Sequence, residues 1–539
     1  MLKIYFNNRS RKAFNKTLIS KTLLSSVSKS GKILRKLDSY ELVLNEQCSN
    51  GYLQILYTII FDFNKDLYRN LNKLTNAIKR WKSQHPFLNC TVLNKDQTDH
   101  LNKKIIFERY FVEILSNNDS KLLKNVQYLE YKQENSSTNA DETIIWSKLN
   151  DLFLNYPIPI ENEYLWRLIF IKLTENRYCL IFNCHHEIAS GKTAHCLTKQ
   201  LLGIINAIYN DKPLTNEFYN TYGLPESLET HLYKKNAKII EEIRLSKEEI
   251  ELNRLHFIVP KCICEPTQSN TFLDLSGSLF DYEKKSTFGF YKQNMPLNAR
   301  AEKFKFNKIM TQKLFFELKK KNVKPTACFG TIISAAVHKA FMMFNVKQSE
   351  IIYGASVNLN QFLTEYIKNG EMGYYGTRAI HKIETKNFDK ILNEDNFDTL
   401  WNVSRTEGEK TRRIIHEKRM LEYPQLRKYD IECMSKSKYN PDEGNYENSF
   451  KVHFILSNIG SIEKLPEFIG NFKILDLYCE TTTPNYGINS QLFIAYLLIT
   501  ADELHIAFEI NTTLKNEFMK CVIDTVRKSV ENILAQGSD

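Results

Sequence analysis

The feature that most constrains the fold is a short strand that leads into two histidines and then, after a glycine, into a helix. The apolar run at residues 178–182 predicts a buried strand, and the sequence Asn-Cys-His-His-Glu-Ile-Ala-Ser-Gly follows it at residues 183–191. Apolar residues then recur on one helical face; they are Ala194, Leu197, Leu201, Ile204, Ile205 and Ile208. Strands and helices also alternate elsewhere in both halves of the chain, which predicts mixed α/β layers.

A histidine at the end of a buried strand suits a general base. The strand holds the ring in place while the ring faces an opening, and proton abstraction requires contact at hydrogen-bond distance. We therefore predict that His186 is the catalytic base and that His185 supports it by hydrogen-bonding inside its lobe. The alternative is a histidine that ends a strand by chance, but the adjacent histidine and the glycine–helix context favour catalysis.

Zinc binding by His185, His186 and His195 is a further alternative. Adjacent histidines on a strand point to opposite faces, so they rarely share one ion. The segment 186–190 also lacks the second histidine of a zincin helix. We therefore expect no metal and no bound cofactor.

The chain of 539 residues is long enough for two or more domains. We divide it into a basic N-terminal arm or targeting segment at 1–34, an N-terminal lobe with the histidine motif at 35–215, an irregular crossover at 216–300 and a C-terminal lobe at 301–539. Strands are predicted at 53–63, 351–359 and 454–460, a hairpin within 492–510, and helices at 67–81 and 514–535.

The net charge of +11 is concentrated at the N-terminus. Residues 1–37 contain ten of the 73 basic residues and no acidic one, so 63 basic residues remain against 62 acidic residues. Because basic and acidic residues are nearly equal in number beyond residue 37, we expect no nucleic-acid partner. The arm resembles a mitochondrial presequence, or alternatively a solvated or membrane-surface segment.

Cysteine usage and hydropathy indicate where in the cell the protein is located and whether it crosses a membrane. Eleven scattered cysteines without a Cys-x-x-Cys pair predict reduced, buried thiols and an intracellular location, either cytoplasmic or mitochondrial. The clean apolar runs are too short to cross a bilayer, so we expect no transmembrane segment. We also expect a monomer.

The histidine motif resembles the His-His-x-x-x-Asp-Gly signature of the coenzyme A-dependent acyltransferase superfamily, with Ser190 at the position of the aspartate. Other segments resemble the same superfamily in the same order, in the branch that contains alcohol acetyltransferases and condensation domains. These segments are residues 35–41, 81–88, 165–168, 356–360 and 457–460.

The resemblance implies a chloramphenicol-acetyltransferase-like fold, with two α/β lobes of mixed sheets and a central channel between them. It further implies an acyltransferase that moves an acyl group, with acetyl as the expected group, from acyl-CoA as co-substrate to a small alcohol or amine. In that scheme His186 accepts the proton of the acceptor, and Ser457 and Asn458 line the substrate channel. Gly191 matches the glycine of the signature.

The departure at Ser190 has a physical interpretation. In the family, the aspartate braces the histidine loop through an arginine of the second lobe, and Asn360 stands at the position of that arginine. Loss of one charge alone would leave the other buried, at a cost of about 3–5 kcal/mol. Loss of both can be nearly neutral, so we expect a Ser190–Asn360 hydrogen bond. The alternative is a catalytically inactive binding protein with the same fold.

Overall fold

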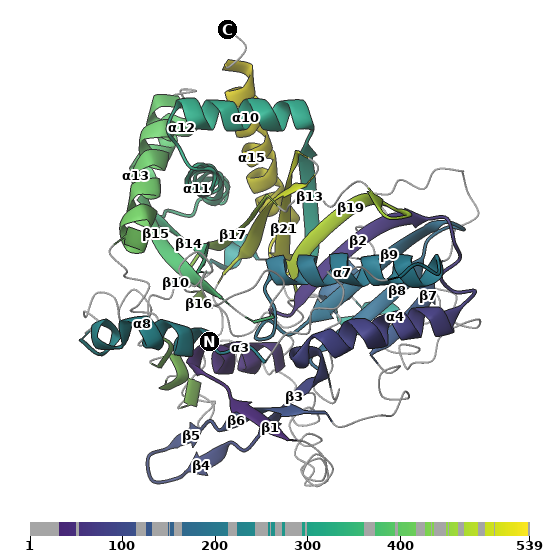
Figure 1. The fold of residues 1–539 in the computed structure, drawn as a ribbon. Coiled ribbons are helices and arrows are strands. Elements are labelled where there is room, and N and C mark those ends of the chain that lie inside the picture. The colour runs from purple at the N-terminus through teal and green to yellow at the C-terminus, as the bar shows by residue number, and fades with distance from the viewer. Residues whose placement is uncertain are drawn as a thin grey trace.

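The computed structural model contains two lobes, each built on a six-stranded sheet (Figure 1). Its strands and helices are mixed in both lobes, which confirms the predicted α/β class. Residues 1–31 of the basic arm lie outside the described part of the chain. The structure describes residues 32–49, 53–114, 125–131, 149, 151–155, 164–213, 224–242, 257–258, 260–264, 272–274, 294–296, 299–359, 372–373, 375–393, 397–416, 426–428, 430–432, 434–435, 449–450, 452–461, 468–482, 491–500 and 502–536.

The first lobe has the strand order β18-β19-β2-β9-β8-β7. Helices α4 (Leu71–Gln84) and α7 (Gly191–Tyr209) lie side by side along this sheet (Figure 1). Trp81 of α4 packs edge-on against Trp166, with ring centroids 5.5 Å apart, and joins the helix layer to the sheet. The strands are β18 (Phe468–Ile469), β19 (Phe472–Thr481), β2 (Ile55–Phe63), β9 (Arg177–Cys184), β8 (Trp166–Lys172) and β7 (Val126–Glu130).

Smaller elements border this lobe. Helix α3 (Ser39–Ser49) precedes β2, and helix α8 (Leu228–Glu242) lies within the crossover at 216–300. Strands β1, β6 and β3 form a separate three-stranded sheet, and β4 and β5 form a hairpin. Their bounds are β1 (Ile33–Lys36), β3 (Cys90–Asn94), β4 (Gln97–Asp99), β5 (Lys104–Ile106) and β6 (Arg109–Glu113).

Strand β19 comes from the C-terminal half of the chain but completes the first sheet. It pairs antiparallel with β2, from Phe472 opposite Phe63 to Thr481 opposite Ile55. The ring of Phe472 stacks on that of Phe63 at a centroid distance of 4.2 Å, so the exchanged strand is part of the first core. The sequence-based division placed all of residues 301–539 in the second lobe and did not contain this exchange.

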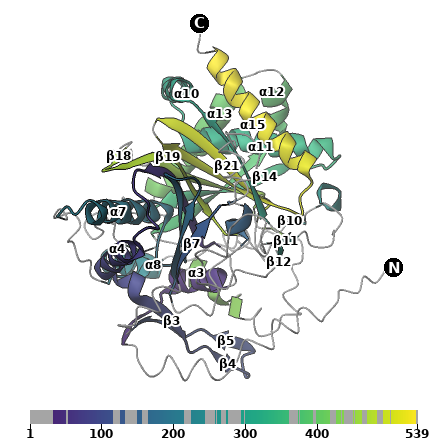
Figure 2. The ribbon, with the colours of Figure 1, turned by 90° about the vertical axis from the view of Figure 1, so that its right-hand side faces the viewer.

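The second lobe has the strand order β13-β21-β20-β17-β14-β15. Helix α15 (Asn516–Gln536) packs along α11 (Pro325–Met343) over this sheet, as Figure 2 shows. The predicted hairpin is β20–β21. The strands are β13 (Ala299–Phe306), β14 (Glu350–Asn358), β15 (Gly376–Glu384), β17 (Phe454–Ser461), β20 (Phe493–Thr500) and β21 (Glu503–Asn511), and the outer helices are α10 (Lys308–Lys320), α12 (Phe388–Asn393) and α13 (Phe397–His416).

Helix α11 is the core helix of the second lobe. By length and apolar composition it is the one helix in the described ranges that could cross a membrane. Most of its side chains are buried between the sheet and helices α13 and α15. A helix that is apolar over most of its surface is a core helix of this kind.

Gly330 allows α11 to pack closely on β14, and its replacement should be costly. A Cβ atom at this position would lie 2.4 Å from the hydroxyl oxygen of Tyr353 and 2.5 Å from its Cζ atom. That ring is fully buried and stacks between His381 and Phe454, so it cannot move aside easily. We expect Gly330→Ala to lower the free energy of unfolding by about 1–3 kcal/mol, measured by urea denaturation.

Gly408 of α13 provides the matched control for this substitution. Its Cβ would make an ordinary contact of 3.5 Å with the Cβ atom of Ala327. Gly408→Ala should therefore raise the stability by up to about 1 kcal/mol, because alanine is the better helix former. Equal effects of the two substitutions would contradict a specific clash at Gly330.

Candidate active site

The histidine motif lies in the turn between β9 and α7, where segments of the C-terminal half meet the first lobe. The amide of Gly373 donates a hydrogen bond of 2.8 Å to the carbonyl oxygen of Ile188. Beside the start of α7, the Cα of Gly191 faces Cys479 of β19 and Ile459 of β17. The loop is therefore held between strands of both sheets.

His186 is half-buried, and its hydrogen bond selects one tautomer. Its Nδ1 atom lies 2.8 Å from the carbonyl oxygen of Ala189. A carbonyl oxygen only accepts hydrogen bonds, so Nδ1 carries the proton and the lone pair of the neutral ring is on Nε2. Burial lowers the pKa of His186 below its ordinary 6.5, against the opposing effect of the Ala189 hydrogen bond. The ring is thus a neutral base at pH 7.

His185 points into the lobe and pairs with a buried carboxylate. Its Nδ1 atom lies 3.0 Å from Oε1 of Glu187, and the same oxygen accepts a hydrogen bond of 2.8 Å from the Asn45 side chain. Burial alone would raise the pKa of Glu187, but the charge and hydrogen bond of His185 and the hydrogen bond of Asn45 lower it overall. Glu187 is fully buried, so this network fixes the loop that carries His186.

Helix α3 supplies the other half of this network. Asn45 reaches Glu187 from α3, and the Cys48 sulfur, near its end, accepts a hydrogen bond of 3.2 Å from the backbone amide of His186. The first contact joins residues 142 positions apart in the sequence. Nothing local in the sequence indicates these contacts, and Glu187, Asn45 and Cys48 were not predicted as site residues.

The same cluster is the candidate metal-binding group in the described ranges. Ligand atoms of Cys48, His185 and Glu187 all lie within 4.8 Å of one another. However, the Gln54 side-chain nitrogen, which also donates to the Cys48 carbonyl oxygen, lies 3.4 Å from Nε2 of His185. Nδ1 of His185 therefore carries a proton whether the ring is neutral or charged. Burial, and after it the charge of Glu187, raises the pKa of the Cys48 thiol. The donor set fits a hydrogen-bonded network better than a metal site.

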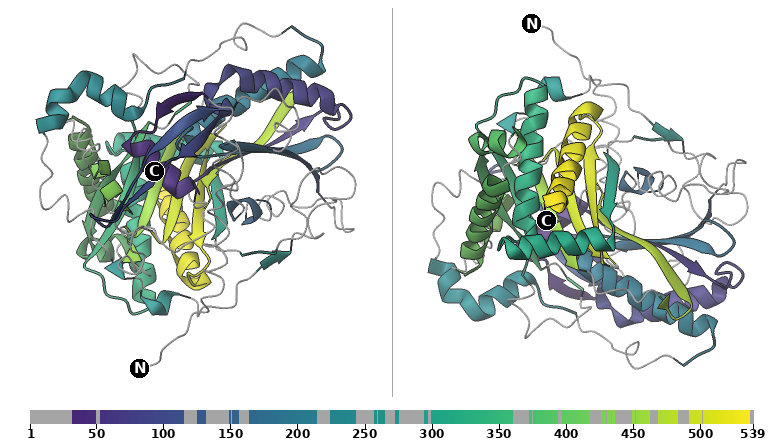
Figure 3. Two further views of the ribbon diagram at one scale, coloured as in Figure 1. Left: turned by 90° about the horizontal axis from the view of Figure 1, so that it is seen from below. Right: turned by 90° about the horizontal axis from the view of Figure 1, so that it is seen from above.

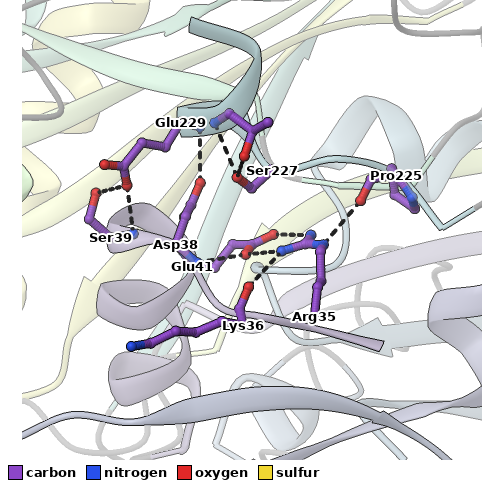
Figure 4. Close-up of polar contacts among 9 residues, drawn as sticks. Arg35, Lys36, Asp38, Ser39, Glu41, Pro225, Ser227 and Glu229 are labelled. Carbon is purple, nitrogen blue, oxygen red and sulfur yellow. Dashed lines mark hydrogen bonds and ion pairs between the residues drawn. The ribbon is translucent and has the colours of Figure 1, made fainter. Parts of the chain in front are cut away.

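The other end of α3 is anchored to the crossover helix, as Figure 4 shows. Asp38 accepts hydrogen bonds from the backbone amides of Glu41 (2.8 Å) and Glu229 (3.0 Å), and Glu229 in return accepts from the amide and hydroxyl of Ser39. The first turns of α3 and α8 thus cap each other. Arg35 holds Glu41 through two hydrogen bonds of 2.6 Å. Burial, and then the charge of Glu41, raises the pKa of Asp38 to about 7.

Ser190 and Gly191 begin helix α7. The Ser190 hydroxyl oxygen accepts a hydrogen bond of 3.2 Å from the amide of Thr193 and lies 2.9 Å from the Thr193 hydroxyl, so it is the N-cap. A Cβ atom on Gly191 would lie 2.8 Å from the Cys479 sulfur. The glycine therefore provides space for β19. The predicted partner of Ser190, Asn360, lies outside the described residues.

The remaining predicted site residues lie on β17. Ser457 is half-buried. The Asn458 amide donates a hydrogen bond of 2.7 Å to Thr326 at the start of α11, and its oxygen accepts one of 2.9 Å from the amide of Gly460. Gly460 has a φ of +79° at an irregularity in the β17–β20 pairing. Asn458 thus stabilises the end of its own strand.

Comparison with known proteins places the fold. No sequence-family model matches the chain, and no curated protein sequence is similar to it. Among solved structures, a trichothecene 15-O-acetyltransferase from Fusarium sporotrichioides is similar with a TM-score of 0.61 at 10% identity, over 93% of this chain and 95% of that chain.

Two synthetase domains are also similar. The epimerization domain from the third module of tyrocidine synthetase B has a TM-score of 0.55 at 12% identity, over 94% of this chain and 99% of that chain. The first condensation domain of the CDA synthetase has a TM-score of 0.52 at 11% identity, over 93% and 96%. The chain therefore has the two-lobe fold of acetyltransferases and condensation domains.

Proposed function

We propose that this protein is a coenzyme A-dependent acyltransferase that moves an acyl group, most simply acetyl, to an alcohol or amine, with His186 as general base. The observation that carries the proposal is the hydrogen bond from Nδ1 of His186 to the Ala189 carbonyl, which puts the lone pair on Nε2. The lowered pKa of His186, caused by burial, supports it, since the ring stays unprotonated at neutral pH. The acetyltransferase among the similar structures supports the reaction class.

In this reaction the acceptor hydroxyl or amine attacks the thioester carbonyl while its proton moves to Nε2 of His186. A C–O or C–N bond forms, the C–S bond breaks, and the coenzyme A thiolate leaves with the proton that His186 returns. Holding both substrates together supplies much of the barrier reduction, so no acyl-enzyme is required. The network of His185, Glu187 and Asn45 keeps the loop in place in the role that the resemblance assigned to an Asp–Arg pair.

The proposal predicts that the purified protein consumes acetyl-CoA only when an acceptor is present. Incubation with acetyl-CoA and a mixed panel of alcohols and amines should release free coenzyme A thiol above the acceptor-free rate. Mass spectrometry of the mixture would identify the acylated product and hence the acceptor class.

The second candidate, an inactive binding protein of the same fold, is favoured by one observation. Ser190 caps α7 and leaves the aspartate position of the motif without a charge. That candidate predicts no thiol release from acetyl-CoA or longer acyl-CoAs across a wide acceptor panel, which would refute the proposed catalysis.

A further inference from the structure

Helix α10 presents an unusual solvent-facing surface. It lies across the top of the second lobe in Figure 1, and the view from above in Figure 3 shows the C-terminus, which follows α15, on the same side of the molecule. Its buried side is formed by Thr311, Leu314, Glu317 and Leu318. On the opposite side Ile309 and Phe316 are 66% and 65% exposed, although both are large apolar side chains. Seven positions separate them, so they lie on the same helical face, two turns apart.

Lysines surround these two side chains. The exposed residues of α10 include Lys308, Lys313, Lys319 and Lys320, and none is acidic. The single acid of the helix, Glu317, is buried and lies 3.7 Å from Lys320. The face therefore combines a hydrophobic stripe with a basic border.

Among the described residues, acids pair with two of the four border lysines, Lys308 and Lys320. Asp502 and Glu503, at the β20–β21 turn, pair with Lys308 at 2.8 Å and Lys305 at 3.0 Å. Both contacts are at the N-terminal end of α10. For Lys313 and Lys319, the structure gives no acidic partner among the residues it describes, so their charges face solvent.

We propose that the Ile309–Phe316 face of α10 docks the protein on an anionic membrane surface. Exposed apolar side chains bordered by lysines are the pattern of helices that lie in the plane of a lipid interface. The apolar groups enter the acyl boundary while the lysine stems extend toward the anionic headgroups. Each lysine close to such a surface adds attraction that falls off within a Debye length, so the binding should weaken with salt. This inference does not depend on the proposed catalysis.

Vesicle co-sedimentation of the full chain tests the docking surface. The protein should bind vesicles of phosphatidylcholine with about 30% phosphatidylserine, and bind neutral phosphatidylcholine vesicles about tenfold or more weakly. Ile309→Ser/Phe316→Ser and, separately, Lys313→Glu/Lys319→Glu should each lower the partition coefficient for the anionic vesicles by about tenfold or more. All four side chains are exposed, so the thermal unfolding midpoint should stay unchanged.

The matched control is on the β4–β5 hairpin, at the opposite end of the molecule from α10 (Figure 1). Leu101 is 91% exposed and Lys103 is exposed in the same turn, so Leu101→Ser/Lys103→Glu removes one apolar and one basic group elsewhere. This variant should bind like the wild type.

Three outcomes would overturn the inference. The first is equal binding to neutral and anionic vesicles. The second is unchanged binding by both α10 variants, which would assign the membrane contact to another region such as the basic segment 1–37. The third is an effect of the α10 variants on self-association in light scattering without an effect on vesicles, which would make this face a protein interface.

Discussion

Replacing His186 by alanine is expected to lower the rate of acyl transfer by about 10²–10⁴-fold while the fold stays intact. The substitution removes the Nε2 lone pair that we propose as the acceptor of the substrate proton, and it leaves the buried pair of His185 and Glu187 in place. The rate of free-thiol release at saturating acetyl-CoA measures the loss. Circular dichroism and the thermal unfolding midpoint of the variant establish that the loss is chemical.

The control for this experiment is His100→Ala, because His100 is exposed between β4 and β5 and its replacement should not affect turnover.

The wild-type pH profile gives an independent signature of the same base. Burial lowers the pKa of His186 from 6.5, and the base form is the unprotonated ring, so kcat/KM should rise with pH and level off with a midpoint below 6.5. Full activity of the alanine variant, or a midpoint well above pH 7, would remove His186 from the mechanism.

Local patterns in the sequence predicted the histidine loop well. The strand at 178–182, the two histidines and the helix after Gly191 form one continuous segment, and the structure has β9, the turn and α7 in that order. Each step depends on neighbours a few positions apart, which periodicity and capping describe. The helix N-cap at Ser190 also follows from sequence, since serine is a preferred N-cap residue.

The support of that loop could not be predicted in the same way. Asn45 and Glu187 are 142 positions apart, and β19 enters the first sheet from the far half of the chain. Such pairings depend on which apolar faces meet, and the residues of β2 and β19 give no unique register on their own. The role of Gly191 was also missed, because its clearance from Cys479 exists only once β19 has joined the sheet.

Replacing Glu187 by alanine should destabilise the protein by about 3–5 kcal/mol, the usual result of breaking a buried ionic pair from one side. The change leaves the side chains of His185 and Asn45 without their shared acceptor in a site closed to water. Glu187→Gln should cost less, because its amide oxygen can keep one of these hydrogen bonds. Urea denaturation at pH 7 gives both values, and Glu409→Gln, at an exposed position on α13, should stay within about 0.5 kcal/mol of the wild type.

The pH dependence of the stability difference between the wild type and Glu187→Gln tests whether this difference is electrostatic in origin. Burial alone would raise the pKa of Glu187. The charge of His185 and the hydrogen bonds from His185 and Asn45 outweigh burial and hold this pKa below its ordinary 4.5, so the folded state favours the carboxylate. Its contribution is complete above pH 4.5 and is lost as the pH falls through the lower folded-state pKa. The gap between wild type and Glu187→Gln should therefore narrow on acidification, because glutamine resembles the protonated acid. Two results would show that this carboxylate does not brace the His186 loop. One is a stability difference between wild type and Glu187→Gln that widens toward low pH, and the other is a loss of less than about 1 kcal/mol in the free energy of unfolding of Glu187→Ala at pH 7.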